Sequence, residues 1–195
     1  MATRLLVTGR PGCGKTTLVK ALLKRFPNRF CGFYTEEVRE GDLRSGFTVA
    51  DVRGLQRLLF ASVSFSKAKK RVSKYGVDVA AFETVALKEM ERSLEEKTPL
   101  VIDEIGKMEL FSERFRNLLE QVFSSPLFVV ATVHSHPHPF TDALKRRSDV
   151  ELLFLDRSNF DETLSKLTFC TASFFERRKQ KGFEAGEEIK TSLKG

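Results

Sequence analysis

Apolar residues recur at helical spacing along much of the chain. Between residues 15 and 26 they fall on one stripe with a period of 3.6 residues, which predicts a helix that Pro27 ends. The other helices predicted from spacing and end signals cover residues 80–95, residues 111–122, a short segment ending at residues 145–147, and residues from 158 or 159 to 177–179.

Two kinds of strand pattern lie between these helices. Continuous apolar runs are typical of buried parallel strands, and they occupy residues 4–8, 100–106, 127–133 and 150–155. Strand-like segments at 30–39 and 44–52 flank the turn Glu40-Gly41-Asp42, which predicts a β-hairpin, and a short strand at 58–63 continues it. The alternation predicts an α/β fold with a mostly parallel central sheet, helices on both faces and an added hairpin.

The segment from Gly9 to Thr16 reads Gly-Arg-Pro-Gly-Cys-Gly-Lys-Thr. It matches the Walker A pattern G-x-x-x-x-G-K-[ST] at every specified position, and it has the required strand before it and helix after it. The fold class that this motif predicts is a Rossmann-like P-loop NTPase.

The residue types of this loop explain how it would bind a phosphate chain. Gly9, Gly12 and Gly14 lack a Cβ, so the backbone is expected to take positive φ angles and to direct its N–H groups inward. Lys15 is expected to reach the β- and γ-phosphates, and the Thr16 hydroxyl to bind Mg²⁺. Cys13 occupies a free position of the pattern, where its N–H matters more than its thiol.

A second informative segment, Leu100 to Gly106, is an apolar run that ends in two carboxylates and has the form of a Walker B strand. If the strand continues, Asp103 and Glu104 point to opposite faces and have different roles. Asp103 is the expected Mg²⁺ partner, mostly through water. Glu104 is the expected group that orients or deprotonates the attacking water, which favours hydrolysis over transfer to a second substrate.

Length and composition set the broad class. A chain of 195 residues with 41% hydrophobic residues fits one domain, expected over residues 1–180, with a loose tail at 181–195 that has little to bury. No apolar stretch is long enough to span a bilayer, and three cysteines without metal-type spacing fit free thiols in a reducing compartment. We therefore expect a cytoplasmic protein. We also expect a monomer. The formal charge of +7 permits nucleic-acid binding without requiring it.

Two polar segments have less specific patterns. The basic run from Lys67 to Lys74 has few aromatic residues that would stack on bases, which favours a solvated loop over a nucleic-acid or substrate-phosphate patch. The segment from His134 to His138 contains all three histidines of the chain. Pro137 and Pro139 favour a polyproline-like loop at the edge of the site over a metal site.

The cluster Lys145, Arg146 and Arg147 precedes the strand at 150–155. One of its arginines is a candidate for stabilising the γ-phosphate in the transition state. A surface cluster paired with Asp149 is an equally good interpretation, and the sequence leaves the choice open.

Several segments together resemble one family, the small P-loop nucleoside-triphosphatases called THEP or cancer-related nucleoside-triphosphatases. The resemblance rests on Gly9 to Thr17, on Gly-Phe-Tyr-Thr-Glu-Glu-Val-Arg from Gly32 to Arg39, on Gly46-Phe47, and on Ile-Asp-Glu-Ile-Gly-Lys-Met-Glu-Leu-Phe from Ile102 to Phe111. The histidine segment and the chain after Lys181 depart from the family pattern.

This resemblance implies slow, Mg²⁺-dependent hydrolysis of ATP, GTP and other nucleoside triphosphates to the diphosphate and phosphate. It implies catalytic roles for Lys15, Asp103, Glu104, Lys107 and Arg147. The nucleotide-binding residues that it implies are Gly9, Arg10, Pro11, Gly12, Cys13, Gly14, Lys15, Thr16, Thr17, Ile105 and Gly106, with Thr16 and Asp103 as Mg²⁺ ligands.

No N-K-x-D segment, which reads guanine in other P-loop proteins, occurs in the chain, so loose base selectivity is expected. Two other functions stay open. A nucleotide or nucleoside kinase would use the cluster at 145–147 as a lid over the donor phosphates. A nucleic-acid-associated switch would use the basic run at 67–74.

Overall fold

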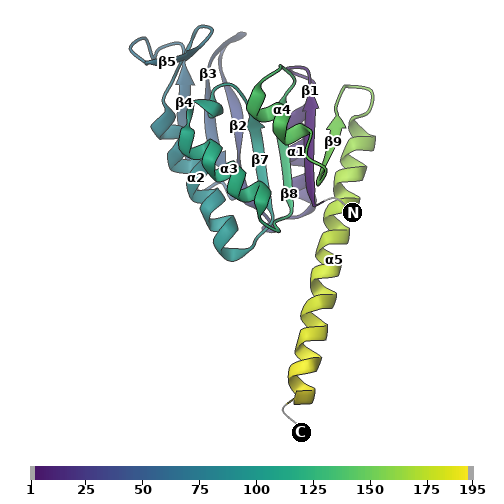
Figure 1. Cartoon of the computed structure of the whole chain (residues 1–195). Helices are drawn as coiled ribbons and strands as arrows, with labels where there is room; N and C mark the ends of the chain where they lie inside the picture. The colour runs from purple at the N-terminus through teal and green to yellow at the C-terminus, as the bar shows by residue number, and fades with distance from the viewer. Residues whose placement is uncertain (1–2, 193–195) are drawn as a thin grey trace.

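The strands of the protein form one mixed sheet. The computed structural model describes residues 3–192, and within them the sheet has nine strands in the order β5-β6-β4-β3-β2-β7-β8-β1-β9 (Figure 1). The elements are, in chain order, β1 (Arg4–Gly9), α1 (Lys15–Arg25), β2 (Cys31–Glu40), β3 (Leu43–Asp51), β4 (Arg57–Ser62), β5 (Lys70–Val72), β6 (Tyr75–Val77), α2 (Val79–Glu96), β7 (Leu100–Ile105), a short 3₁₀ turn η1 (Glu109–Phe111), α3 (Glu113–Ser124), β8 (Val129–His134), α4 (Pro139–Lys145), β9 (Val150–Phe154) and α5 (Phe160–Ser192).

One half of the sheet is parallel and the other is antiparallel. Strands β2, β7, β8, β1 and β9 run parallel, and β1 lies between β8 and β9. Because parallel strands end at the same edge, the segments that follow β1, β7 and β8 meet there. From β2 outward the strands β3, β4, β6 and β5 are antiparallel and extend the sheet as a meander.

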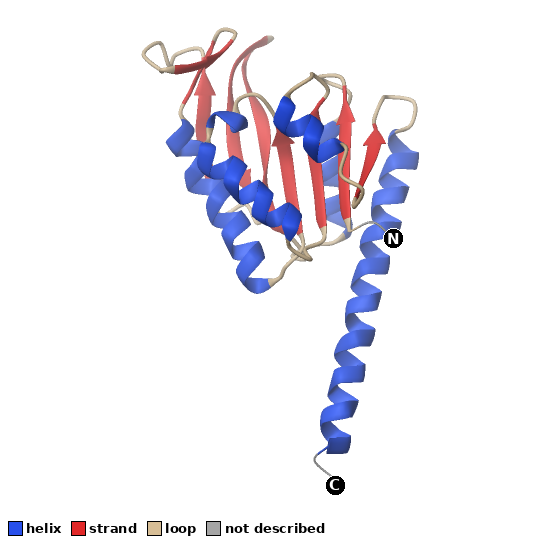
Figure 2. Ribbon diagram, viewed as in Figure 1, coloured by secondary structure: helices blue, strands red, loops and turns tan. Residues whose placement is uncertain are grey.

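Helices cover both faces of the sheet (Figure 2). Successive residues of β1 point to opposite sides, as strand geometry requires: Leu6 belongs to the core beneath α2 and α3, whereas Leu5 and Val7 belong to the core beneath α1 and α5. The predicted α/β fold, with a parallel centre, two helical layers and an added hairpin, is therefore confirmed.

The basic run at 67–74 differs from the predicted loop in its backbone. Residues 70–72 and 75–77 pair as the strands β5 and β6. Its lysines and arginine are nonetheless exposed, as expected of a solvated segment. Arg71 donates to the backbone oxygens of Phe65, Ser66 and Lys74, so it closes the turn and does not face a free surface groove.

The prediction that the last helix ends at 177–179 is wrong. Helix α5 continues to Ser192 and extends past the edge of the sheet (Figure 1). No proline lies between residues 160 and 192, and once the packed first turns have nucleated a helix, each further residue adds one backbone hydrogen bond. Residues 193–195 of the predicted loose tail lie outside the described residues.

Between residues 3 and 192, no helix combines the length and the apolar composition that crossing a bilayer requires.

One glycine is a strict requirement of the parallel half. Gly32, in β2, has a φ of +128°, and a Cβ at this position would overlap the backbone of Val101 in the neighbouring strand. We predict that Gly32→Ala lowers the free energy of unfolding by more than about 3 kcal/mol, measured by urea denaturation. Gly41→Ala, in the hairpin turn, also has a positive φ but faces open space, so it should cost only about 1–2 kcal/mol. Equal losses in both variants would contradict the steric argument.

Candidate functional site

The segment from Gly9 to Thr16 forms a loop at the sheet edge where β1, β7 and β8 end. Gly12 and Gly14 have φ angles of 75° and 105°, as the predicted anion-binding curl requires. Gly9 does not have a positive φ. It is required for a different reason, because a Cβ there would overlap the carbonyl oxygen of Leu155 and the sulfur of Cys13.

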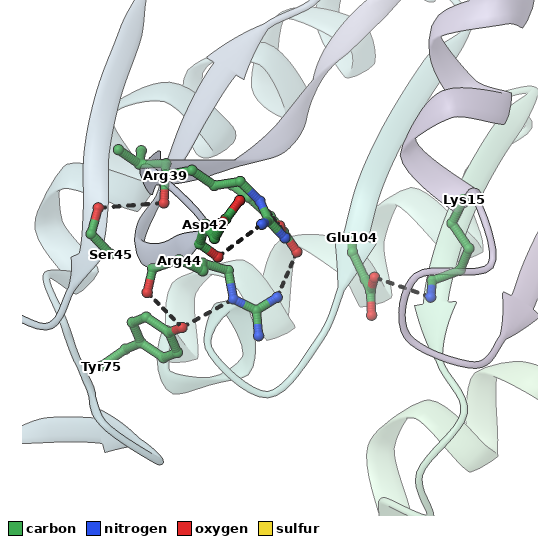
Figure 3. A network of polar contacts seen from close by, with 9 residues as sticks. Lys15, Arg39, Asp42, Arg44, Ser45, Tyr75 and Glu104 are labelled. Carbon is green, nitrogen blue, oxygen red and sulfur yellow. Dashed lines mark hydrogen bonds and ion pairs between the residues drawn. The ribbon is translucent and has the colours of Figure 1, made fainter.

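Lys15 lies inside this loop. Its ammonium group donates to the carbonyl oxygen of Gly9 at 3.3 Å and lies 3.6 Å from Oε2 of Glu104. Only 7% of the side chain is exposed. Figure 3 shows Lys15 and Glu104 reaching toward each other from the loop and from β7. The structure therefore holds a positive charge at the mouth of the loop, within reach of a bound anion.

Asp103 is fully buried between two threonine hydroxyls. Thr16 donates to Oδ2 at 2.7 Å, and Thr132, on β8, donates to Oδ1 at 2.5 Å. Burial raises the pKa of Asp103 to about 6, and the two hydroxyl donors offset part of this effect. One carboxylate thus connects the first turn of α1 to two strands of the sheet.

Glu104 contacts Lys15, whereas Asp103 contacts Thr16 and Thr132. The two carboxylates therefore have different partners, which suits the different roles expected of them. The ladder between β7 and β8 shifts register between Ile102 and Ile105, and the Asp103-Glu104 peptide bond is cis. Burial raises the pKa of Glu104, and the nearby Lys15 ammonium counteracts the shift.

The oxygens of Thr16 and Asp103 suit a hard divalent cation. A hydroxyl and a carboxylate at 2.7 Å supply the oxygen ligands that Mg²⁺ prefers, and Mg²⁺ in P-loop sites keeps several waters and takes few protein ligands. In the described part of the chain no group of three or more His, Cys, Asp or Glu residues could hold a metal ion. Thr16 and Asp103, the two expected ligands, are therefore suited to Mg²⁺.

Two cavities flank the phosphate loop. One, of about 690 Å³, opens between the loop and the β2–β3 hairpin, and we call it the hairpin cavity. The other, of about 800 Å³, lies between the loop and the end of β9, and we call it the β9 cavity. Its wall includes Arg10, Pro11, Gly12, Cys13, Lys145, Phe154 and Arg157.

The remaining expected site residues lie in or beside the hairpin cavity. Thr17, Gly106 and Lys107 line it, whereas Ile105 is a buried residue of the core. Lys107 is exposed, and within the described residues its ammonium group has no hydrogen-bond or ion-pair partner. It is therefore available to a ligand.

Glu109 is a site residue that the sequence reasoning did not single out. It lines the hairpin cavity and is 6% exposed. Burial raises its pKa to about 8, and the charge of Glu104 adds to the shift. Its only signal in the sequence was its position inside the family-like segment from Ile102 to Phe111.

The histidine segment divides between two elements and does not form one loop. His134 ends β8, and His138 caps α4 by accepting from the N–H of Phe140. His134 is buried, with Nε2 3.3 Å from the Thr141 hydroxyl, and burial together with the Lys145 charge lowers its pKa to about 4. His134 and His136 line the hairpin cavity, so the expected position at the site edge agrees with the structure.

Arg147 does not lie at the site, and its predicted catalytic role is corrected here. Its guanidinium donates to both carboxylate oxygens of Asp149 and to the carbonyl oxygen of Phe123. Asp149 also pairs with Arg4, the first residue of β1. Because the phosphate loop follows the last residue of β1, Arg147 is about 17 Å away along the strand. The surface ion pair was the correct alternative.

Arg44 is the arginine that lines the hairpin cavity instead. It lies near the start of β3, and its sequence signal was its place beside Gly46-Phe47 in the hairpin. Lys145, the other end of the proposed lid, pairs with Asp142 and lines the β9 cavity. The cluster at 145–147 therefore does not assemble as a lid over the loop.

Comparisons with known proteins agree with this geometry. A family model described as NTPase matches residues 4–168. The nucleoside-triphosphatase THEP1 of Thermotoga maritima is 39% identical over 84% of this chain and 92% of its own length. The cancer-related nucleoside-triphosphatase homolog of Bos taurus is 34% identical over 86% of this chain and 95% of its own length. The crystal structure of THEP1 from Aquifex aeolicus superposes with a TM-score of 0.78 at 40% identity, covering 84% of this chain and 96% of that one.

The buried carboxyl of Glu109 makes a stability prediction. The folded protein keeps this proton up to about pH 8, whereas the unfolded chain loses it near its ordinary pKa of 4.5. The carboxyl therefore makes the free energy of unfolding fall as pH rises between these values. We predict that Glu109→Gln has a higher Tm than the unchanged protein at pH 8.5. The gain in Tm at pH 8.5 should exceed the gain at pH 5 by about 5 °C. The exposed Glu120→Gln is the control, and a gain that does not depend on pH would contradict the prediction.

Proposed function

Because this chain belongs to the NTPase family, we propose that it hydrolyses ATP, GTP and other nucleoside triphosphates to the diphosphate and phosphate, with Mg²⁺ and slow turnover. The observation that carries the proposal is the juxtaposition, at one loop, of the Lys15 ammonium, the Glu104 carboxylate and the Thr16–Asp103 pair. These are a phosphate-binding cation, a base for water and a pair of metal-binding oxygens.

The triphosphate would lie across residues 9–16. The inward N–H groups of the loop and the start of α1 favour negative charge. Lys15 would exchange its contacts with Gly9 and Glu104 for phosphate oxygens. This exchange leaves a Glu104 oxygen available for a water molecule, so substrate binding and activation of the base are coupled.

Thr16 and Asp103 would hold the magnesium ion on the side of α1 and β7. When bound, Mg²⁺ neutralises charge that develops on the β- and γ-phosphate oxygens. Thr132 keeps the Asp103 carboxylate in place through its 2.5 Å hydrogen bond. The chain thus supplies Asp103 as a fixed ligand, with Thr16 beside it, and water would supply the remaining ligands of the magnesium ion.

Glu104 would orient the attacking water and accept its proton. Its pKa is raised above the ordinary value, toward the range in which a carboxylate is an effective base at neutral pH. As the water oxygen bonds to the γ-phosphorus, the bond to the β–γ bridging oxygen breaks and the diphosphate leaves.

The position of Arg147 supports slow turnover. Arg147 is bound to Asp149 far from the loop, and P-loop sites without an arginine at the γ-phosphate turn over at about 10⁻⁴ to 10⁻² per second. Lys107 is exposed and lines the hairpin cavity, and we assign it to binding phosphate oxygens there.

The nucleobase would occupy the β9 cavity. Phe154, at the end of β9, is 70% exposed there, and Arg157 lies on the same wall. An exposed ring beside a cation stacks on any base without reading its edge. This surface supports the broad base specificity that we propose. The free thiols of all three cysteines support a reducing compartment such as the cytoplasm.

Glu104→Gln separates binding from chemistry. We predict that it lowers the rate of phosphate release from ATP by about 10²–10⁴-fold. Its Kd for ATP, measured with Mg²⁺ by calorimetry, should stay within about threefold. Arg147→Gln is the control, and its turnover should stay within about twofold of the unchanged protein. Full activity of the Glu104→Gln variant would remove Glu104 from the mechanism.

The stacking surface makes a second prediction. Phe154→Ala should raise KM for ATP and for GTP by a similar factor, about tenfold, with kcat unchanged. Phe169→Ala removes another exposed phenylalanine, on α5 and outside the β9 cavity, and should change neither constant. A loss confined to one of the two nucleotides would show that Phe154 takes part in base selection.

A further inference from the structure

The hairpin cavity extends well beyond the phosphate loop. Its inner end is the phosphate loop with Lys15, Thr16 and Glu104, and its outer wall comes from β3 and from the turn between β5 and β6. Figure 3 shows Lys15 and Glu104 on one side of the view and Arg44 and Tyr75 on the other. A water molecule needs only about 30 Å³, whereas the cavity of about 690 Å³ extends from the phosphate loop to β3 and to the turn between β5 and β6, so it has room for a second ligand beside the donor phosphates.

The outer wall is held in one geometry by its own contacts. Arg44 donates from Nε to the Tyr75 hydroxyl at 3.0 Å and from Nη1 to Glu37 at 2.5 Å, and the Tyr75 hydroxyl donates to the Arg44 carbonyl oxygen at 3.3 Å. The rings of Phe47 and Tyr75 meet edge to face at 5.2 Å. The Arg44 guanidinium lies 5.0 Å from the Phe47 ring centre. Such a network is preorganised for a ligand.

Two cations that line the cavity have donors to spare. Nη2 of Arg44 has no partner among the described residues, and neither does the ammonium group of Lys107. The nearby carboxylates are already neutralised, because Glu36 pairs with Lys20 and Arg57 while Glu37 pairs with Arg39 and Arg44. The unpaired donors of Arg44 and Lys107 are therefore available to an anion.

We propose that the outer part of the hairpin cavity binds a nucleoside monophosphate, which accepts the γ-phosphoryl group in place of water. Arg44 and Lys107 bind its phosphate, and the base packs on Phe47, the partly exposed ring of this wall. Planar cations such as Arg44 favour phosphate oxygens, and aromatic rings favour a planar base.

The transfer balances without any further reactant. An oxygen of the monophosphate forms a bond to the γ-phosphorus of the donor, and the bond from that phosphorus to the β–γ bridging oxygen breaks. One triphosphate and one monophosphate become two diphosphates. The attacking oxygen is already ionised, because the second pKa of a phosphate monoester is about 6. The step therefore needs no proton acceptor, whereas the attack of water does.

This difference separates the inference from the proposed hydrolysis on which its donor site rests. In Glu104→Gln, supplied with ATP, Mg²⁺ and a mixture of radiolabelled nucleoside monophosphates, labelled diphosphate should form while free phosphate stays low. Failure of Glu104 as the base would appear as unchanged phosphate release. Failure of the second site would appear as the absence of labelled diphosphate from every monophosphate in the mixture, and that result would overturn the inference.

Two arginines of the hairpin provide a matched pair for binding. Arg39 and Arg44 both pair with Glu37, but only Arg44 lines the cavity. Equilibrium dialysis of the labelled monophosphate that serves as acceptor, with Mg²⁺ and a non-hydrolysable ATP analogue, should show at least tenfold weaker binding to Arg44→Gln. Arg39→Gln should bind as the unchanged protein does. Equal losses of binding in both variants would overturn the inference, because Arg44 would then act through the hairpin fold. A parallel fall of transfer and hydrolysis in Arg44→Gln would also overturn it, because Arg44 would then act on the γ-phosphate.

Discussion

The hydrogen bonds of Asp103 with Thr16 and Thr132 are the constraint on which the site depends. They join the first turn of α1 to β7 and β8, so the phosphate loop cannot move independently of the sheet. Asp103 is fully buried, and removing either hydroxyl would leave one carboxylate oxygen without its donor in a dry environment. The parallel order of β7, β8 and β1 brings these three segments together in space, although they are far apart in the chain.

The parallel and antiparallel halves of the sheet contribute different parts of the candidate site. The parallel half supplies the loop, the carboxylates and the surface beside β9, where strand ends meet. The antiparallel half adds a hairpin whose side chains enclose the space in front of the loop. Without this meander the space in front of the loop would lack its outer wall, which includes Arg44, Phe47 and Tyr75.

The sequence predicts those parts of the site that depend on local pattern. Walker A and Walker B residues carry their context with them, so the two motifs alone identify Lys15, Thr16, Asp103 and Glu104. Arg44, Glu109 and the Thr132 contact depend on how distant segments meet, which spacing along one segment does not encode. The role of Arg147 is undecided at the level of sequence, because an arginine near a strand looks the same at either end of the sheet. Periodicity underestimates the length of α5, because a helix needs a packed start, and not packing along its whole length, to continue.

The distribution of aromatic residues has a spectroscopic consequence. The chain has no tryptophan and only two tyrosines, Tyr34 and Tyr75, beside eighteen phenylalanines. Tyr34 lies on β2 near Lys20 and Arg57, and Tyr75 lies on the wall of the hairpin cavity. The intrinsic tyrosine emission of the protein therefore originates from β2 and from β6 at the wall of the hairpin cavity. Tyrosine fluorescence therefore offers a native optical probe of the hairpin side of the candidate site.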